Sequence, residues 1–309
     1  MAKAMQVAQK GDLIAIRSGS YELQSEIPWE EERGRILPRV TLVGVDSDVT
    51  LTVTPFNHLS NHIHTALSNT TLRNLTVKTT GDELTLKSSS VINCTLTAPA
   101  TVGLLRNSHA EQSVEGTKIQ NCRVDGSVSV DGDGIVTDTT MAQLRMSGYK
   151  NTVKRCTIGK QGPPEVVVFT DTVAGSRILD STIYGKIIEQ SGPNRSDVYH
   201  LDEIKRCQFR ASGGVNWFFK SVPAKKIWLN AFIGADISLP KGSVWDAGSG
   251  TSDPIRLYSK KHKLGNYYSA FKKNDENGDG VIDLPRPIPG KGDVVDQYPL
   301  ANSDLSQYR

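Results

Sequence analysis

The sequence predicts an all-β chain folded as a right-handed parallel β-helix, with a short helical cap before it and an Asp- and Asn-rich loop closing its C-terminal end. Three observations predict this fold class. A six-residue phrase returns seven times, the segments between its copies are rich in Val, Ile, Thr and Ser, and helical periodicity is nearly absent. A phrase that returns at intervals near 25 residues is typical of a solenoid, in which each copy marks one coil.

The repeated phrase reads apolar, polar, Asn or Arg or Asp, small, polar, apolar. Its copies are residues 72–77, 91–96, 119–124, 153–158, 178–183, 204–209 and 227–232. The spacings from start to start are 19, 28, 34, 25, 26 and 23 residues, so we expect one coil per copy, with loops bulging out of the longest intervals. The β-helix with its cap is predicted to span residues 1–240, and a C-terminal cap residues 241–309.

The third and fourth positions of the phrase predict a corner and a buried column. Asn and Asp tolerate the left-handed backbone that a tight corner needs, whereas Arg155 and Arg206 fit this position less well. All the cysteines occupy the fourth position: Cys94, Cys122, Cys156 and Cys207. We expect them to pack as small residues in one column, while a disulfide between adjacent coils and a metal site stay open as alternatives.

The N-terminal cap is predicted from residues 2–9, the one helix candidate in the sequence. A solenoid needs a cap at its open end, because the first strand otherwise leaves its backbone amides unpaired.

The C-terminal loop, residues 275–283, carries the strongest chemical signal. Its oxygen donors at loop positions 1, 3, 5 and 9 are Asp275, Asn277, Asp279 and Asp283, and position 7 offers the backbone carbonyl of Val281. With a glycine at position 6, this is the spacing that Ca²⁺ requires. The alternative is a plain polar turn.

The predicted calcium loop departs from an EF-hand after its ninth position. Arg286 stands at position 12 in place of the bidentate Glu, and the prolines from Pro285 onward exclude an exit helix. We therefore expect a calcium turn in which Asp293 or Asp296 supplies the missing carboxylate.

Residues 265–269, 274–283 and 293–300 resemble the C-terminal signature of NosD-like β-helix proteins, and residues 11–21 and 40–44 resemble the first two coils of that family. The resemblance implies a parallel β-helix of the carbohydrate-binding and sugar-hydrolase type, usually exported and often part of an envelope protein. It fixes no ligand. Tyr268 stands where the family usually has Trp.

Two further groups of residues are candidates for sites. His58, His62 and His64 are placed for copper or zinc, but they lack a nearby Cys or Glu, and we expect them to be polar coil residues. The residues that fit a substrate groove are Lys220, Arg210, Trp217, Tyr199 and His200. The aromatic residues near them, Trp228 included, are more typical of core or groove wall than of catalysis.

The composition excludes several classes of function. A net charge of +3 gives no electrostatic reason to expect nucleic acid, and no run of about 18 apolar residues predicts a transmembrane segment. We expect an extracellular or cell-surface structural or adhesive protein that binds Ca²⁺ and contacts itself or a polysaccharide. The alternative is a polysaccharide lyase or another carbohydrate-active enzyme on the same scaffold, and the sequence favours the non-catalytic role.

Overall fold

The computed structural model describes residues 4, 7–24, 39–54, 64–67, 69–160, 166–189, 201–211, 224–235, 237, 256–289 and 294–308. They form two compact units. Unit 1 comprises Met1–Val130 with Ile135–Met141, and unit 2 comprises Asp131–Gly134 with Ala142–Arg309. No helix among the described residues has the length and apolarity that crossing a bilayer requires.

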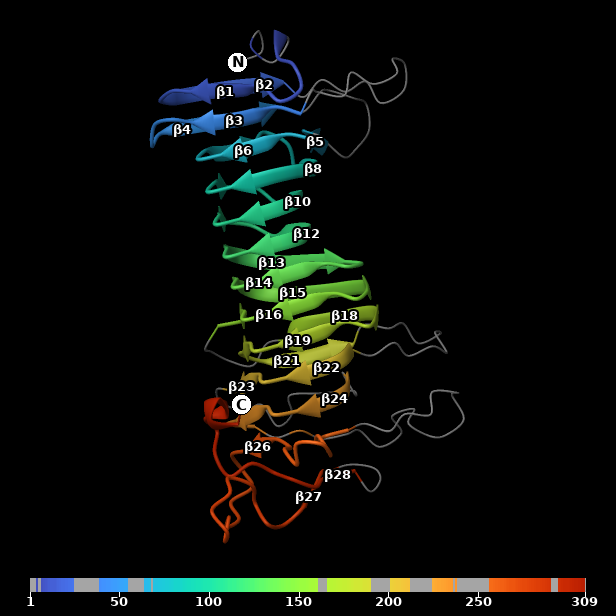
Figure 1. Cartoon of the computed structure of the whole chain (residues 1–309). Helices are drawn as coiled ribbons and strands as arrows, with labels where there is room; N and C mark the ends of the chain where they lie inside the picture. Colours follow the sequence, from blue (N-terminus) through green and yellow to red (C-terminus); the bar gives the residue numbers. More distant parts are fainter. Residues whose placement is uncertain are drawn as a thin grey trace. The chain divides into compact units, whose positions relative to one another are not determined.

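Unit 1 is built from short strands that pair in parallel. In chain order the first strands are β1 (Leu13–Ile16), β2 (Gly19–Gln24), β3 (Thr41–Gly44), β4 (Val49–Thr54), β5 (His64–Ala66), β6 (Thr71–Arg73), β7 (Thr76–Thr79), β8 (Glu83–Ile92), β9 (Thr95–Leu96), β10 (Ala100–Arg106), β11 (His109–Ala110), β12 (Val114–Gln120), β13 (Arg123–Asp131) and β14 (Ile135–Thr137). One series of parallel pairs runs β1, β3, β6, β8, β10, β12, β14, and a second runs β2, β4, β7, β9, β11, β13. Figure 1 shows β3, β6, β8, β10 and β12 one beneath the other.

The register stacks equivalent apolar residues of the phrase. Leu72 lies opposite Val91, and Val91 lies opposite Leu105. All three side chains are fully buried. Because these residues are the first apolar members of their phrase copies, the repeat in the sequence corresponds to a repeat in space. The prediction of a nearly all-β chain with parallel pairing is confirmed for the described residues, and it is consistent with the expected β-helix.

The two longest intervals hold strands and not bulging loops. Leu105 of β10 pairs with both Val91 and Ile119, so it divides the interval of 28 residues into two shifts of 14. Val136 of β14 pairs with Ile119 and shows a shift of 17 residues within the interval of 34. Residues 105–110 and 136–141 are therefore two further copies of the phrase. The expectation of loops in these intervals was wrong, because the chain uses shorter repeats there.

The third position of the phrase has a left-handed backbone, as predicted. The φ angle is 54° at Asn74, 53° at Asn93 and 51° at Asn121. The amide side chains join neighbouring corners, since Asn93 Nδ2 donates to Asn74 Oδ1 over 3.3 Å. Arg155 and Arg206 adopt the same backbone, with φ of 55° and 53°, although arginine is poorly suited to it.

The fourth position forms buried columns of small polar side chains. All four cysteines are buried free thiols, as the packing hypothesis predicts. In unit 1 the backbone N–H of Cys94 donates to Ser108 Oγ over 3.1 Å. In unit 2 the N–H of Cys156 donates to Ser181 Oγ and that of Cys207 to Asn230 Oδ1. Burial raises the pKa of Cys94 to about 11 and that of Cys207 to about 12, so these thiols are inert packing groups.

Unit 2 continues the same pattern of pairing within itself. Its strands are β15 (Thr140–Tyr149, whose first two residues belong to unit 1), β16 (Thr152–Lys154), β17 (Thr157–Ile158), β18 (Val166–Ala174), β19 (Arg177–Leu179), β20 (Thr182–Ile183), β21 (Lys186–Glu189), β22 (Leu201–Lys205), β23 (Gln208–Arg210), β24 (Ala224–Trp228), β25 (Ala231–Ile233), β26 (Tyr267–Tyr268), β27 (Arg286–Pro287) and β28 (Val295–Asp296), followed by the 3₁₀ helix η1 (Leu305–Gln307). β16, β19, β22 and β24 pair in parallel in that order. Only β27 and β28 form a separate antiparallel pair among the described strands.

The interior of unit 2 ends in a stack of aromatic rings and a small core under η1. The ring centroids of Phe209 and Phe232 lie 4.9 Å apart, and those of Phe232 and Tyr268 lie 5.4 Å apart. Leu305 and Tyr308 pack against Leu229. The C-terminal segment therefore covers the end of the parallel strands.

Two predictions about the ends of the β-helix fall largely outside the described residues. Of the expected N-terminal helix, a single hydrogen bond of 3.1 Å from Ala8 N to Ala4 O is described. The predicted boundary after residue 240 lies in residues 238–255, which the structure does not describe. Both stay predictions.

Candidate functional site: a basic groove and a C-terminal loop

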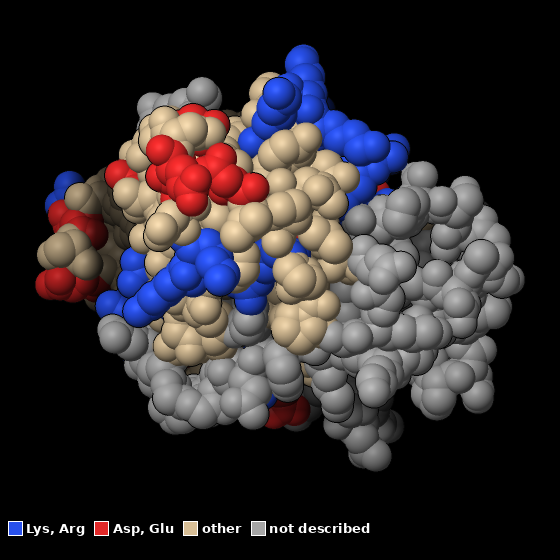
Figure 2. Space-filling view, turned by 90° about the horizontal axis from the view of Figure 1, so that it is seen from below, with Lys and Arg blue, Asp and Glu red and all other residues tan. Residues whose placement is uncertain are grey.

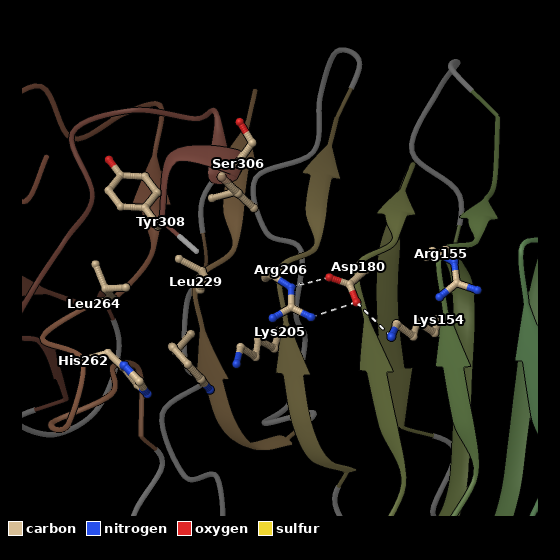
Figure 3. Close-up of a pocket in the computed structure, with 12 residues that line it drawn as sticks. Lys154, Arg155, Asp180, Lys205, Arg206, Leu229, His262, Leu264, Ser306 and Tyr308 are labelled. Carbon is tan, nitrogen blue, oxygen red and sulfur yellow. Dashed lines mark hydrogen bonds and ion pairs between the residues drawn. The ribbon is translucent and has the colours of Figure 1, made fainter.

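A groove of about 670 Å³ lies on unit 2, where the phrase copies meet the C-terminal segment (Figure 3). Its walls differ in chemistry. The charged wall consists of Lys154, Arg155, Asp180, Lys205 and Arg206, and the other wall consists of Trp228, Leu229, His262, Leu264, Leu305, Ser306 and Tyr308.

The register of the strands brings the charged residues into rows. Lys154 of β16 pairs with Leu179 of β19, which pairs with Lys205 of β22, and Lys205 pairs with Trp228. These are the second positions of their phrase copies. The residues that follow them, at the third position, are Arg155, Asp180, Arg206 and Leu229. Because parallel strands lie about 4.8 Å apart, equivalent positions present neighbouring side chains.

Asp180 is held by the basic residues on either side of it. Arg206 donates to both of its carboxylate oxygens, over 2.9 Å from Nη2 to Oδ2 and from Nε to Oδ1. Lys154 Nζ lies 3.9 Å from Oδ2. The hydrogen bond from Arg206 lowers the pKa of Asp180. The charged wall counts four cations against one carboxylate, a net charge of +3 without His262.

Trp228 fixes the position of Lys205. Its indole N–H donates to Glu203 Oε1 over 2.8 Å, and the Lys205 ammonium lies 3.9 Å from the centre of its ring. The His262 ring is stacked on Trp228 at 5.8 Å. Burial, followed by the charge of Arg206, lowers the pKa of Lys205. The groove therefore offers a positioned cation beside aromatic and aliphatic surface, an arrangement suited to an anionic ligand with apolar faces.

The structure describes few of the groove residues that the sequence predicts. Lys220, Trp217, Tyr199 and His200 lie outside the described residues. Arg210 is exposed and donates to Gln208 Oε1. The histidine cluster is not tested either, because His58 and His62 are not described and His64 is described only as backbone in β5.

Sequence reasoning missed the basic wall of the groove. Its signal was present, since the copies at 153–158 and 204–209 both read apolar, Lys, Arg, Cys. These are two neighbouring basic residues at the positions that the repeat exposes.

In the predicted calcium loop, each Asp or Asn side chain accepts a backbone hydrogen bond within the loop. The two Asp275 oxygens accept from the N–H groups of Gly278 and Gly280 over 2.9 and 2.8 Å. Asn277 accepts from Asp279 N, and Asp279 accepts from Val281 N. These bonds fold the loop into consecutive Asx turns.

Asp283 closes the predicted loop onto its beginning. It accepts from Glu276 N over 2.7 Å and from Asn277 Nδ2 over 3.1 Å. The carbonyl of Gly280 accepts from Tyr308 Oη and Ala301 N, which ties the loop to the C-terminal segment. In the view of Figure 2, acidic side chains gather in one patch and basic side chains lie beside it.

The donor set of the loop fits Ca²⁺ in its chemistry but not in its spacing. Carboxylate, amide and carbonyl oxygens are the ligands that this ion prefers. Within the part of the chain that the structure describes, however, no three Asp, Glu, His or Cys side chains come close enough together to hold a metal ion.

Asp296 has a role that the sequence does not predict. Its buried carboxylate accepts from Asn266 N over 2.7 Å, from Tyr298 N over 3.1 Å and from Tyr268 Oη over 3.0 Å. Asn266 Oδ1 in turn accepts from the N–H of Asn230, whose own Oδ1 accepts from the N–H of Cys207. Asp296 thus ends the buried column, and its oxygens are committed there. Asp293 lies outside the described residues.

Comparison with protein-family models, with curated proteins and with solved structures gives no match to the chain.

Proposed function

We propose that the chain is a right-handed parallel β-helix of the cell surface or extracellular space whose groove on unit 2 contacts glycans without transforming them. The parallel registers and the resemblance to NosD-like proteins support the architecture and the location. The observation that carries the functional part is the groove itself, which places positioned cations opposite an aromatic and aliphatic wall.

The chemistry of the groove favours binding over catalysis. Sugars present hydroxyl groups along their edges and C–H groups on their faces, so they suit a site with both charged donors and apolar surface. Asp180 is the one carboxylate in the described wall of the groove. Since Arg206 binds both of its oxygens and lowers its pKa, Asp180 is a weak proton acceptor at neutral pH.

Co-sedimentation of the purified chain with insoluble cell-wall polysaccharides tests this proposal. Trp228→Ala removes the aromatic surface and the support of Lys205, and it should reduce the bound fraction several-fold. Tyr149→Ala, which removes an aromatic side chain that is 53% exposed, serves as the matched control and should leave it unchanged. Binding to no polysaccharide in the panel would contradict the proposal.

A polysaccharide lyase is the second candidate, and Lys205 is the observation that favours it. A lysine with a lowered pKa beside an arginine resembles a base next to a charge-neutralising cation. Incubation with uronate polysaccharides separates the two candidates. Rising absorbance from unsaturated chain ends, lost in Lys205→Gln, would replace the binding function with lyase chemistry.

We further propose that Ca²⁺ rigidifies the C-terminal loop through Asp275, Asn277, Asp279, Val281 and Asp283. The proposal requires the carboxylates to move closer together than they lie here. Calcium should raise the melting temperature of the chain, and Asp279→Ala should abolish that rise. Glu276→Ala, at loop position 2, removes a charge without removing a donor and should keep the rise. An unchanged response in Asp279→Ala would exclude this loop as the site.

The proposal includes self-association as an alternative use of the same surface. Flat repeated faces suit packing into a layer or filament. Concentration-dependent sheets or filaments in negative stain, in place of glycan binding, would favour assembly as the main role.

A further inference from the structure

The corner column of the phrase changes its chemistry along the chain. At Asn74, Asn93 and Asn121 the left-handed corner carries the residue type best suited to it. In unit 2 the same position carries Arg155 and Arg206, with φ of 55° and 53°. Arginine in this conformation is unfavourable, since its Cβ crowds the following carbonyl oxygen. Backbone strain that persists at particular positions is typical of functional sites.

Both strained arginines line the groove, and only one of them is bound to the groove carboxylate. Arg206 makes two hydrogen bonds to Asp180, so these two charges compensate one another. Arg155, Lys154 and Lys205 then supply the positive charge of the wall. The strained corners therefore concentrate cationic groups where an Asn ladder would leave the surface neutral.

The positions of these cations are defined before any ligand arrives. Lys205 rests against the Trp228 ring at 3.9 Å, and the indole is anchored on Glu203. Lys154 is drawn toward Asp180 at 3.9 Å. Held side chains lose less conformational freedom on binding than free ones do, which favours a specific contact over diffuse attraction.

We propose that the groove selects acidic glycans, with a carboxylate or sulfate group of the sugar bound between Arg155, Lys154 and Lys205 and the ring against Leu264 and Leu305. This inference rests on the proposed glycan-contacting function and adds the charge of the ligand. A guanidinium accepts a planar carboxylate or a sulfate through paired hydrogen bonds, and the aliphatic side chains offer a surface for the C–H face of the sugar.

Titration calorimetry of the full chain tests the inference with four soluble polymers. Polygalacturonate and dextran sulfate carry the two acidic groups, dextran is the neutral counterpart, and poly(dT) is a polyanion without sugar acids. We expect binding to at least one acidic glycan, weaker binding to poly(dT), and none to dextran. Which acidic polymer binds identifies the carboxylate or the sulfate.

Arg155→Asn is the decisive variant, because Asn suits the left-handed corner and removes only the charge. It should weaken binding to the acidic glycan about tenfold, the loss expected for one charge-assisted contact. Lys118→Gln removes a charge from an exposed position on unit 1 and should change the affinity less than twofold. The melting temperatures of both variants should match that of the parent chain.

Three results would overturn the inference. Equal losses in Arg155→Asn and Lys118→Gln would show diffuse attraction without a site. Dextran binding as tight as that of the acidic polymers would remove the selectivity for charge and leave glycan contact standing, whereas binding to no glycan would remove both. Tighter binding to poly(dT), weakened by Arg155→Asn, would assign the groove to nucleic acid.

Discussion

Asp296 should make the stability of the chain depend on pH, and Asp296→Asn isolates that dependence. The carboxyl group is buried at the end of a hydrogen-bonded column, beside Tyr268. Burial raises its pKa from 3.8 to about 6, against the hydrogen bonds that Asn266 and Tyr298 donate to it. The folded chain therefore holds a proton on Asp296 more tightly than the unfolded chain does.

The sign and size of the effect follow from that difference. The stabilisation by the bound proton is complete below about pH 4 and is lost as the pH rises through about 6. A difference of about two pH units between folded and unfolded chains corresponds to about 3 kcal/mol. Asparagine at position 296 keeps the shape of the side chain and does not titrate.

Urea unfolding of both proteins between pH 4 and 7.5, in a calcium chelator, gives the measurement. The free energy of unfolding of the parent chain minus that of Asp296→Asn should fall by about 3 kcal/mol across this range. A difference that stays constant would refute the raised pKa. A difference that grows with pH would show that Arg286, which lies opposite Asp296 in the β27–β28 pair, holds the carboxylate in its charged form.

Three shorter predictions concern the packing of the fold. Gly265→Ala places a methyl group against the Asp296 carboxylate and should destabilise the chain by about 1–3 kcal/mol in thermal unfolding; a loss below about 0.5 kcal/mol would show that the contact relaxes. Asn121→Ala should cost about 1 kcal/mol more than Asn121→Gly, because glycine accepts the φ of 51° without strain, and equal costs would leave only the side-chain bond to Asn107 as the cause. The four cysteines should resist a thiol reagent in the native chain and react on unfolding, and rapid labelling of the native chain would contradict their burial.

The repeat could be predicted from the sequence because its apolar positions and its corner are set by local chemistry. Two copies, 105–110 and 136–141, were missed. Their fourth position holds Ser108 and Thr139 and not cysteine, yet both hydroxyls accept the backbone N–H of the preceding column residue. A search that treats Cys, Ser, Thr and Asn as equivalent at this position finds both copies.

The groove could not be predicted, because it depends on which exterior positions fall beside one another. Sequence reasoning treated Arg155 and Arg206 as imperfect corner residues, which is correct for the backbone but says nothing of their neighbours. Only the register that aligns residues 154, 179 and 205 shows that the cations form one wall. Asp296 illustrates the converse. Its closeness in sequence to the loop suggested a metal ligand, and the fold uses it to end a column instead.

One register thus sets both the interior and the exterior of unit 2. The backbone N–H of Cys207 needs an acceptor from the next copy, and Asn230 supplies it only if the copies align residue by residue. That alignment leaves positions 155, 180 and 206 in one exterior row, free to vary in charge because the interior column already fixes the stack. A change of charge at the corner should therefore alter binding while stability changes little, whereas a change in the buried column should do the reverse.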